Sequence, residues 1–328
     1  MEERARSYPA GQTDAGRQNA IILPANELHQ EAAPAVLSEG NHSMKVLLTG
    51  ATGFIGSSVL NALIAAGHDV TAVVRSDEAG KRVAANGATA VIHPLPDTDW
   101  LTEMLTLSDG AIHLATPDDD SGPIFDDSVI DSVIAAYSGT NKPYVHTGGV
   151  WVYGNGADLT EESPINAPEI TAWRQEREDR LLASHVRASV VAPGIVHGYG
   201  KGIPNTISGG PRTEDGALIL IGGGTQHWAT VHVDDLAELF VAVLENAPGG
   251  ETYLGVSGHN PTVRELAEAV VGPDGTVKAD TVEAARERFG VQFADALLLD
   301  QQMTGAKAKS QFGWNPSRPN LVEEFSKL

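Results

Sequence analysis

The stretch Thr49-Gly50-Ala51-Thr52-Gly53-Phe54-Ile55-Gly56 lies between a short apolar run at residues 46–49 and an amphipathic segment that extends to Ala66. Its glycines have the spacing G-x-x-G-x-x-G. Between a strand and a helix, such glycines permit a tight turn, let the backbone approach a pyrophosphate and allow the helix to pack closely on the strand. The free N–H groups at the start of the helix attract phosphate. This context predicts a dinucleotide-binding loop.

From Met44 onward, short apolar or β-branched runs alternate with amphipathic segments. The predicted strands lie at residues 46–49, 70–74, 89–92, 110–115, 143–147 and 188–192. Further predicted helices lie at residues 77–86, 98–107, 126–137 and 169–185. Strands that alternate with crossover helices form a parallel sheet covered on both faces. The sequence therefore predicts an α/β fold with a doubly wound parallel sheet, in which residues 44–192 form a Rossmann dinucleotide-binding core.

The chain changes character on both sides of this core. Residues 1–43 mix Gly, Pro, Gln and Ala without periodicity, which predicts a disordered N-terminal extension; the alternative is an ordered arm packed on the domain. After Pro193 the regular alternation of strand and helix patterns ends, and glycine-rich loops follow at residues 198–202 and 222–224. We expect residues 193–328 to form mainly a smaller substrate-binding lobe, with some segments returning to the main sheet.

The chain of 328 residues has no cysteine and a formal net charge of −21. The lack of cysteine excludes disulfides, thiolate metal ligands and Cys nucleophiles. Nucleic acids and anionic membranes need a clustered basic surface, so the charge argues against both as partners. No apolar run approaches the ~18 residues needed to span a bilayer. We expect a cytoplasmic protein whose partner is a small-molecule substrate.

The residue after the second predicted strand discriminates between nicotinamide dinucleotides. An acidic residue there binds the ribose 2′-hydroxyl of NAD, whereas an arginine accommodates the 2′-phosphate of NADP. Arg75 follows the strand, with Lys81 and Arg82 close behind it. A guanidinium can pair with a phosphate through two parallel hydrogen bonds. Arg75 therefore favours NADP(H) over NAD(H), the alternative being an exposed arginine that only increases solubility.

At several ordered motifs the chain resembles the extended form of the short-chain dehydrogenase/reductase superfamily, with its epimerase- and dehydratase-like members. Residues 49–56 resemble the cofactor loop, and residues 113–115 resemble the segment beside the adenosine and ribose. Residues 147–154 resemble the family's Ser-Ser-x-x-Val-Tyr-Gly segment. Residues 193–198 resemble the stretch whose backbone approaches the nicotinamide amide, and residues 229–237 resemble the signature of the second lobe. Together with Arg75, the resemblance implies cofactor contacts from Gly50, Thr52, Gly53, Phe54, Ile55, Gly56, Leu114, Ala115, Thr147, Pro193, Ile195 and Val196.

The family's chemistry uses a tyrosine and a lysine four residues later, and this pair has no counterpart here. Counting without gaps from Glu162-Ser163-Pro164 places Trp173 and Arg177 at the two positions. Matching the pattern of the following helix instead places Ile170 and Arg174 there. A cofactor loop without the tyrosine resembles the atypical branch of the superfamily, whose members are often labelled epimerases or dehydratases on fold alone.

The candidate catalytic residues are therefore Thr147, Tyr153 and Arg177. Thr147 could contact the nicotinamide ribose or a carbonyl, because the usual Ser or Thr position holds Gly149; equally, it could simply end a strand. Tyr153 could donate a proton or pack in the core. Arg177, or Arg174, could hold the ribose in place of lysine, although charge pairing along the helix surface is the alternative for both.

Further polar residues follow the nicotinamide-facing stretch. His197 is expected to be a neutral loop histidine rather than an acid. His232, Asp234 and Asp235 resemble a metal cluster on paper, but we expect one of the aspartates to cap the helix that follows. No metal site is predicted.

The leading interpretation is an NADP(H)-dependent oxidoreductase that acts on a small carbonyl or alcohol with a substituted proton donor. A non-catalytic NADP(H)-binding sensor or scaffold is the second, because the Tyr/Lys pair is missing. A nucleotide-sugar epimerase or dehydratase ranks third, because residues 193–270 hold few cations: Lys201, Arg212 and Arg264. The resemblance also implies a homodimer formed through the helices near residues 126–137 and 169–185.

Overall fold

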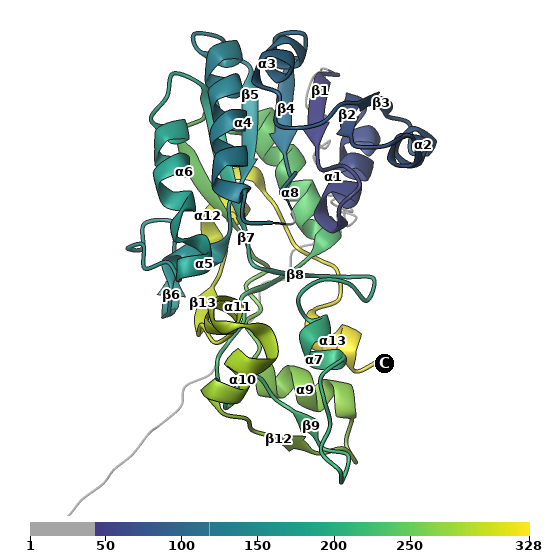
Figure 1. Cartoon of the computed structure of the whole chain (residues 1–328), viewed down its shortest axis with the longest axis vertical. Helices are drawn as coiled ribbons and strands as arrows, with labels where there is room; N and C mark the ends of the chain where they lie inside the picture. Colours follow the sequence, from purple (N-terminus) through teal and green to yellow (C-terminus); the bar gives the residue numbers. More distant parts are fainter. Residues whose placement is uncertain (1–42, 118) are drawn as a thin grey trace, which may run out of the picture. The chain divides into compact units, whose positions relative to one another are not determined.

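The computed structural model describes residues 43–117 and 119–328. Within these residues, the main sheet contains β1 (Lys45–Thr49), β2 (Asp69–Val74), β3 (Thr89–Ile92), β4 (Gly110–His113), β5 (Pro143–Thr147), β7 (Arg187–Pro193) and β11 (Glu251–Gly255). Their order is β11-β7-β5-β4-β1-β2-β3, and every neighbouring pair is parallel (Figure 1). The strand order reverses between β1 and β4, which makes the sheet doubly wound and confirms the predicted fold class.

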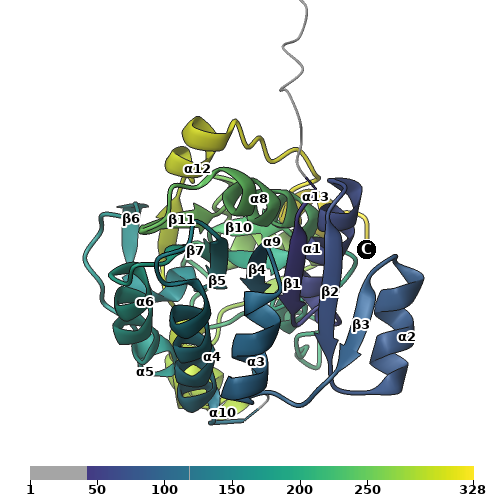
Figure 2. The same cartoon turned by 90° about the horizontal axis from the view of Figure 1, so that it is seen from above.

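Helices cover both faces of this sheet, as Figure 2 shows. One layer contains α1 (Phe54–Ala65), α2 (Asp77–Ala85), α8 (Val233–Asn246) and α12 (Ala306–Phe312); the other contains α3 (Thr98–Thr106), α4 (Gly122–Tyr137) and α6 (Arg174–Leu182). Alternate residues of β1 face opposite layers: Val46 and Leu48 pack in the first, and Leu47 packs in the second. A strand buried on both faces reads as a continuous apolar run, which is why its periodicity is weak in the sequence.

The structure differs from the sequence-based boundaries in two helices beside the site. α4 begins at Gly122 rather than near residue 126, because Pro123 fits the first turn of a helix, where its missing N–H is not needed. The helix expected over 169–185 consists of two pieces. α5 (Glu169–Ala172) starts after Pro168, and α6 begins after Trp173.

The part of the chain after Pro193 adds small elements below the carboxyl edge of the main sheet (Figure 1). Two-stranded parallel pairs are formed by β8 (Ile195–His197) with β10 (Thr230–His232), by β9 (Leu218–Ile219) with β12 (Val277–Lys278), and by β13 (Gln301–Met303) with the earlier β6 (Gly156–Leu159). The helices are α7 (Asn205–Ser208), α9 (Val263–Val271), α10 (Val282–Phe289), α11 (Val291–Leu297) and α13 (Leu321–Phe325). They enclose an apolar cluster of their own, whereas β11 joins the main sheet beside β7.

The predicted disordered extension falls on residues 1–43, of which 1–42 lie outside the described residues. In the described part of the chain, no helix is both long and apolar enough to cross a bilayer.

Candidate dinucleotide and substrate site

A cavity of about 570 Å³ opens at the carboxyl ends of the central strands. This is the edge at which doubly wound sheets bind ligands, and the volume lies within the range of small-molecule sites. Its walls come from the glycine turn after β1, the ends of β4, β5 and β7, the 3-10 helix η1 (Val150–Tyr153), α5, the first residue of α6 and the loop after β8. The site therefore combines segments that are far apart in the sequence.

The glycine turn has the geometry of a phosphate cradle. Gly50 has a φ of +76°, and a Cβ there would lie 2.5 Å from the carbonyl carbon of Leu114. A Cβ on Gly56 would overlap the carbonyl oxygen of Gly50. The first N–H groups of α1 have no intrahelical partners, as in any α-helix, and the N-cap residue Gly53 has no side chain to accept a hydrogen bond from them. These residues fit the pyrophosphate of a dinucleotide.

Most of the expected cofactor contacts line this cavity: Gly50, Gly53, Phe54, Ile55, Gly56, Leu114, Ala115, Thr147, Pro193, Ile195 and Val196. Thr52 and Arg75 do not. Both are exposed; Thr52 lies in the turn, and Arg75 follows β2. The arginine side chain is long enough to reach a ligand bound at the end of β2. The contact of Arg75 with the cofactor is therefore taken up below as a proposal.

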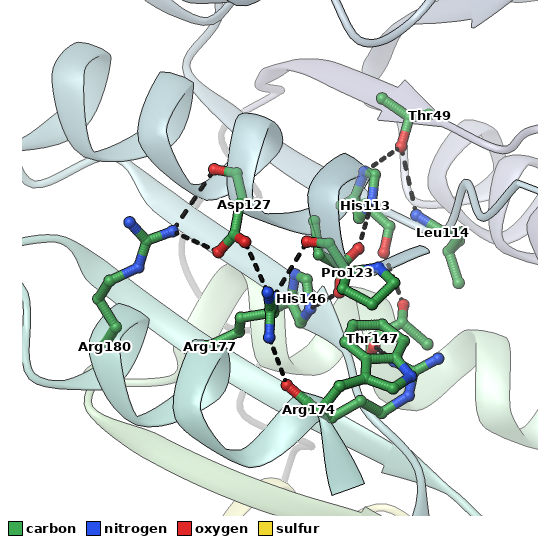
Figure 3. Close-up of polar contacts among 12 residues, drawn as sticks. Thr49, His113, Leu114, Pro123, Asp127, His146, Thr147, Arg174, Arg177 and Arg180 are labelled. Atoms are coloured by element: carbon green, nitrogen blue, oxygen red, sulfur yellow. Dashed lines mark hydrogen bonds and ion pairs between the residues drawn. The ribbon is translucent and has the colours of Figure 1, made fainter. Parts of the chain in front are cut away.

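The hydroxyl of Thr147, at the end of β5, already donates a hydrogen bond within the protein. Its Oγ1 donates to the carbonyl oxygen of His113 at 2.6 Å (Figure 3). The hydroxyl can still accept a hydrogen bond through its lone pairs, but it has no second proton to donate to a carbonyl. This chemistry suits a contact with a ribose hydroxyl better than activation of a substrate.

Only one of the two residue pairs from the α5–α6 alignments lines the cavity. Ile170 and Arg174 line the cavity. Arg174 lies over the ring of Trp173, with 4.6 Å between its guanidinium carbon and the ring centroid, and donates to the carbonyl oxygen of Thr147 at 3.2 Å. Arg177 points to α4 instead, where it donates to Asp127 at 2.6 Å (Figure 3). Arg174, not Arg177, is the arginine in the cavity.

Tyr153 is also outside the cavity. It belongs to η1 and packs, 5% exposed, in an apolar cluster with Val152, Ala192 and Leu254. Burial, together with the charges of Glu161 and Glu178, raises the pKa of its hydroxyl above the ordinary value. A phenol in these surroundings holds its proton in the core rather than at the cavity wall.

A buried carboxylate with two histidines lies at the cavity and was not anticipated from the sequence. Asp126 of α4 has one oxygen 3.7 Å from Nε2 of His113 and the other 3.4 Å from Nε2 of His146. Burial opposes ionisation of Asp126, but the two histidines outweigh it and hold the pKa of the carboxyl well below its usual range. Burial also lowers the pKa of His146. Asp126 and His113 line the cavity, so its polar wall carries a negative charge.

Glu178 lies behind the cavity wall, one helical turn after Arg174. Its side chain is buried, and its Oε1 has no hydrogen-bond partner among the described residues. Burial raises the pKa of this carboxyl to about 7, although the charge of Arg174 opposes the rise. A Cβ on Gly148 would lie 2.9 Å from Oε1 and 2.9 Å from Cγ1 of Val190, so the glycine leaves room for the buried carboxyl.

The polar residues after β8 and β10 have structural partners. Nδ1 of His197 lies 3.2 Å from Glu324 of α13, and no group of described residues has the make-up of a metal site. The expected aspartate cap is wrong: His232 caps α8 by accepting from the backbone N–H of Asp234. Asp235 instead accepts hydrogen bonds from the C-terminal segment at residues 317–318.

Comparison with known proteins supports this picture. Residues 42–131 match the NmrA-like family. The chain is 32% identical to an uncharacterized protein of Schizosaccharomyces pombe, C2A9.02, and 30% identical to an uncharacterized protein of Saccharomyces cerevisiae, YLL056C; each alignment covers 86% of this chain and 98% of the yeast protein. The crystal structure of the human epimerase family protein SDR39U1 with NADPH superposes with a TM-score of 0.62 at 24% identity, covering 87% of this chain and 99% of the human chain. The protein thus belongs to the same family as these two yeast proteins, and it shares the fold of SDR39U1.

Proposed function

We propose that the protein is an NADP(H)-dependent oxidoreductase that acts on a small carbonyl or alcohol. The observation that carries this proposal is the cavity itself, in which the glycine cradle and the backbone of residues 193–196 face one continuous space. A cofactor bound along these segments has its pyrophosphate at the N-terminus of α1 and its nicotinamide near the loop after β7.

The residues that would hold the cofactor follow from this geometry. The N–H groups at the start of α1 bind the pyrophosphate, and Leu114 and Ala115 contact the adenosine half. Thr147 accepts a hydrogen bond from a ribose hydroxyl, and Arg174 donates to the same ribose in place of a lysine. When bound, the nicotinamide supplies or accepts the hydride.

Substrate positioning falls to side chains of α5 and α6. Thr171 lines the cavity, and among residues 43–117 and 119–328 its hydroxyl makes only a long hydrogen bond of 3.4 Å, to the carbonyl oxygen of Pro168. It is free to turn and donate to a carbonyl oxygen, which Arg174 can polarise from the same side. Reduction of the carbonyl also needs one proton, which Ile170 cannot give and which must therefore reach the substrate oxygen from solvent, so we expect slow turnover.

The preference for NADP(H) rests on Arg75. The residue is exposed at the end of β2, with Lys81 and Arg82 exposed on the following helix α2. These charges suit a 2′-phosphate and not the 2′-hydroxyl of NAD. The presence of NADPH in the similar human structure supports the same choice.

One observation favours a second candidate, a non-catalytic NADP(H) sensor or scaffold. Ile170, one of the two residues that align with the family's tyrosine, lines the cavity and has no proton to exchange, and the other, Trp173, is not a tyrosine either. A nucleotide-sugar epimerase is disfavoured, because Arg174 is the one Lys or Arg among the described residues that line the cavity.

A homodimer and a cytoplasmic location remain part of this proposal. In the structure α4 and α6, the helices expected at a dimer interface, also pack on each other through ion pairs of Arg177 and Arg180 with Asp127 and Asp131. Sedimentation of the full chain tests whether a second copy associates.

The function is tested by titrating the full chain with NADPH and with NADH, followed by nicotinamide fluorescence. We expect NADPH to bind at least about tenfold more tightly, which is ~1.4 kcal/mol, and Arg75→Ala to remove the preference. Oxidation of NADPH by a panel of ketones then separates the enzyme from the sensor. Tight NADPH binding without turnover on any ketone would favour the sensor.

A further inference from the structure

Part of the cavity wall outside the segments assigned to the cofactor is apolar. It consists of Val150 and Trp151 from η1, Ile170 from α5 and Ile203 from the loop after β8. None of these belongs to the segments assigned to the cofactor. We propose that this part of the cavity binds an uncharged aromatic carbonyl compound, whose ring packs on Trp151. That the ligand is a carbonyl compound rests on the proposed function. Its aromatic and uncharged character is inferred from the residues that line the cavity.

The ring of Trp151 is held in place by neighbouring side chains. Its ring meets that of Phe293 of α11 edge to face, with 6.0 Å between centroids and an angle of 64°. Trp151 and Ile203 both pack against the apolar cluster of the C-terminal segments. A ring held in this way from behind offers its remaining surface to the cavity without an entropic cost for ordering the side chain.

The charges around the cavity argue against an anionic substrate. Arg174, its single Lys or Arg among the described residues, already lies over Trp173 and donates to the carbonyl oxygen of Thr147. Asp126 adds a buried negative charge to the same cavity. A pyrophosphate or carboxylate on the substrate would enter without enough cationic partners and would lose its hydration.

The apolar wall favours an aromatic ring over an aliphatic one. A flat ring can stack offset on, or meet edge-on, an indole at centroid distances of 4.5–7 Å, which contributes about 0.5–1.5 kcal/mol beyond the burial of its area. It also has no internal rotations to freeze on binding. A carbonyl group attached directly to such a ring can accept hydrogen bonds from Thr171 and Arg174 through its oxygen.

Binding of matched ketones to the NADP⁺-loaded full chain tests this proposal without turnover, because NADP⁺ cannot reduce a ketone. Acetophenone is compared with cyclohexyl methyl ketone, its aliphatic counterpart, and with UDP-glucose, by ligand-observed saturation-transfer NMR and competition. Trp151→Ala is the test variant. Trp100→Ala is its control, because Trp100 lies on α3 and stacks on His93, away from the cavity.

We expect acetophenone to bind at least about tenfold more tightly than cyclohexyl methyl ketone, and Trp151→Ala to weaken acetophenone about tenfold with unchanged NADP⁺ affinity. Equal binding of the two ketones, displacement of acetophenone by UDP-glucose, no acetophenone binding, or insensitivity to Trp151→Ala would each overturn the proposal. Failure of the proposed function has a different signature: NADP⁺ itself does not bind, or a bound ketone is never reduced when NADPH replaces NADP⁺.

Discussion

Replacing Glu178 by glutamine should stabilise the protein, and the gain should grow with pH. The carboxyl is buried behind Gly148, and burial raises its pKa from the usual 4.5 to about 7. Glutamine has nearly the same shape and carries no charge at any pH. The variant therefore removes the cost of ionising a buried carboxyl and leaves the packing in place.

The sign and size of the effect follow from proton linkage. A carboxyl whose folded-state pKa is raised binds more protons in the folded than in the unfolded chain between pH 4.5 and about 7, so its contribution to stability falls as pH rises through this window. At ~1.36 kcal/mol per pKa unit, the full rise corresponds to about 3 kcal/mol. Between pH 5 and pH 8.5 the difference in unfolding free energy between Glu178→Gln and wild type should grow by about 2.5 kcal/mol.

Urea denaturation of the wild type and the variant at several pH values measures this difference directly. Glu176→Gln, an exposed carboxyl on the same helix, is the matched control and should follow the wild type. If Glu178→Gln and wild type ran parallel from pH 5 to pH 8.5, Glu178 would titrate alike in the folded and unfolded chains. The assignment of Glu178 as a buried carboxyl whose Oε1 has no hydrogen-bond partner among the described residues would then be wrong.

The other predictions concern charged residues with assigned partners. Arg174→Ala should weaken NADPH binding at least about tenfold in a fluorescence titration, because Arg174 lines the cavity. Arg177→Ala should leave the affinity within about twofold, because Arg177 binds Asp127 instead. A larger loss in Arg177→Ala than in Arg174→Ala would favour the alignment that places Arg177 at the lysine position. Asp235→Ala should cost about 3 kcal/mol of unfolding free energy, because a buried carboxylate that holds Arg318 is lost. Glu238→Ala, which removes the more exposed partner of the same arginine, should cost under ~1 kcal/mol, and similar losses in the two variants would contradict this assignment.

The features that the sequence predicted well are local ones. The turn from Gly50 to Gly56 depends on close approaches within a few residues and to one neighbouring strand, and glycine spacing records them. Six strands of the main sheet are short apolar runs bounded by turns, and their positions were predicted to within about two residues, whereas the edge strand β11 was not predicted. The sequence predicted the doubly wound class of the sheet, but the order of its strands comes from the structure.

The parts of the site that the sequence could not specify depend on packing between distant elements. Arg174 and Arg177 lie on one helix, and only the irregular path of the chain from Gly154 to Pro168 decides which of them faces the cavity. Asp126 meets His113 and His146 because α4 crosses two adjacent strands at that level. His113 and His146 are partners in the register of the neighbouring strands β4 and β5 and therefore point to the same face, but nothing in the sequence spacing shows that a carboxylate lies above them.

The central claim is that this cavity binds a nicotinamide dinucleotide, and it is tested most directly by titrating the full chain and Gly56→Ala with NADPH. A methyl group at position 56 overlaps the carbonyl oxygen of Gly50, whereas Gly149→Ala, also in the cavity wall, meets no atom within 4 Å and is the control. We predict saturable NADPH binding to the wild type and to Gly149→Ala, and its loss in Gly56→Ala with a folded circular-dichroism spectrum. Absence of binding to the wild type, or unchanged affinity in folded Gly56→Ala, would contradict the assignment.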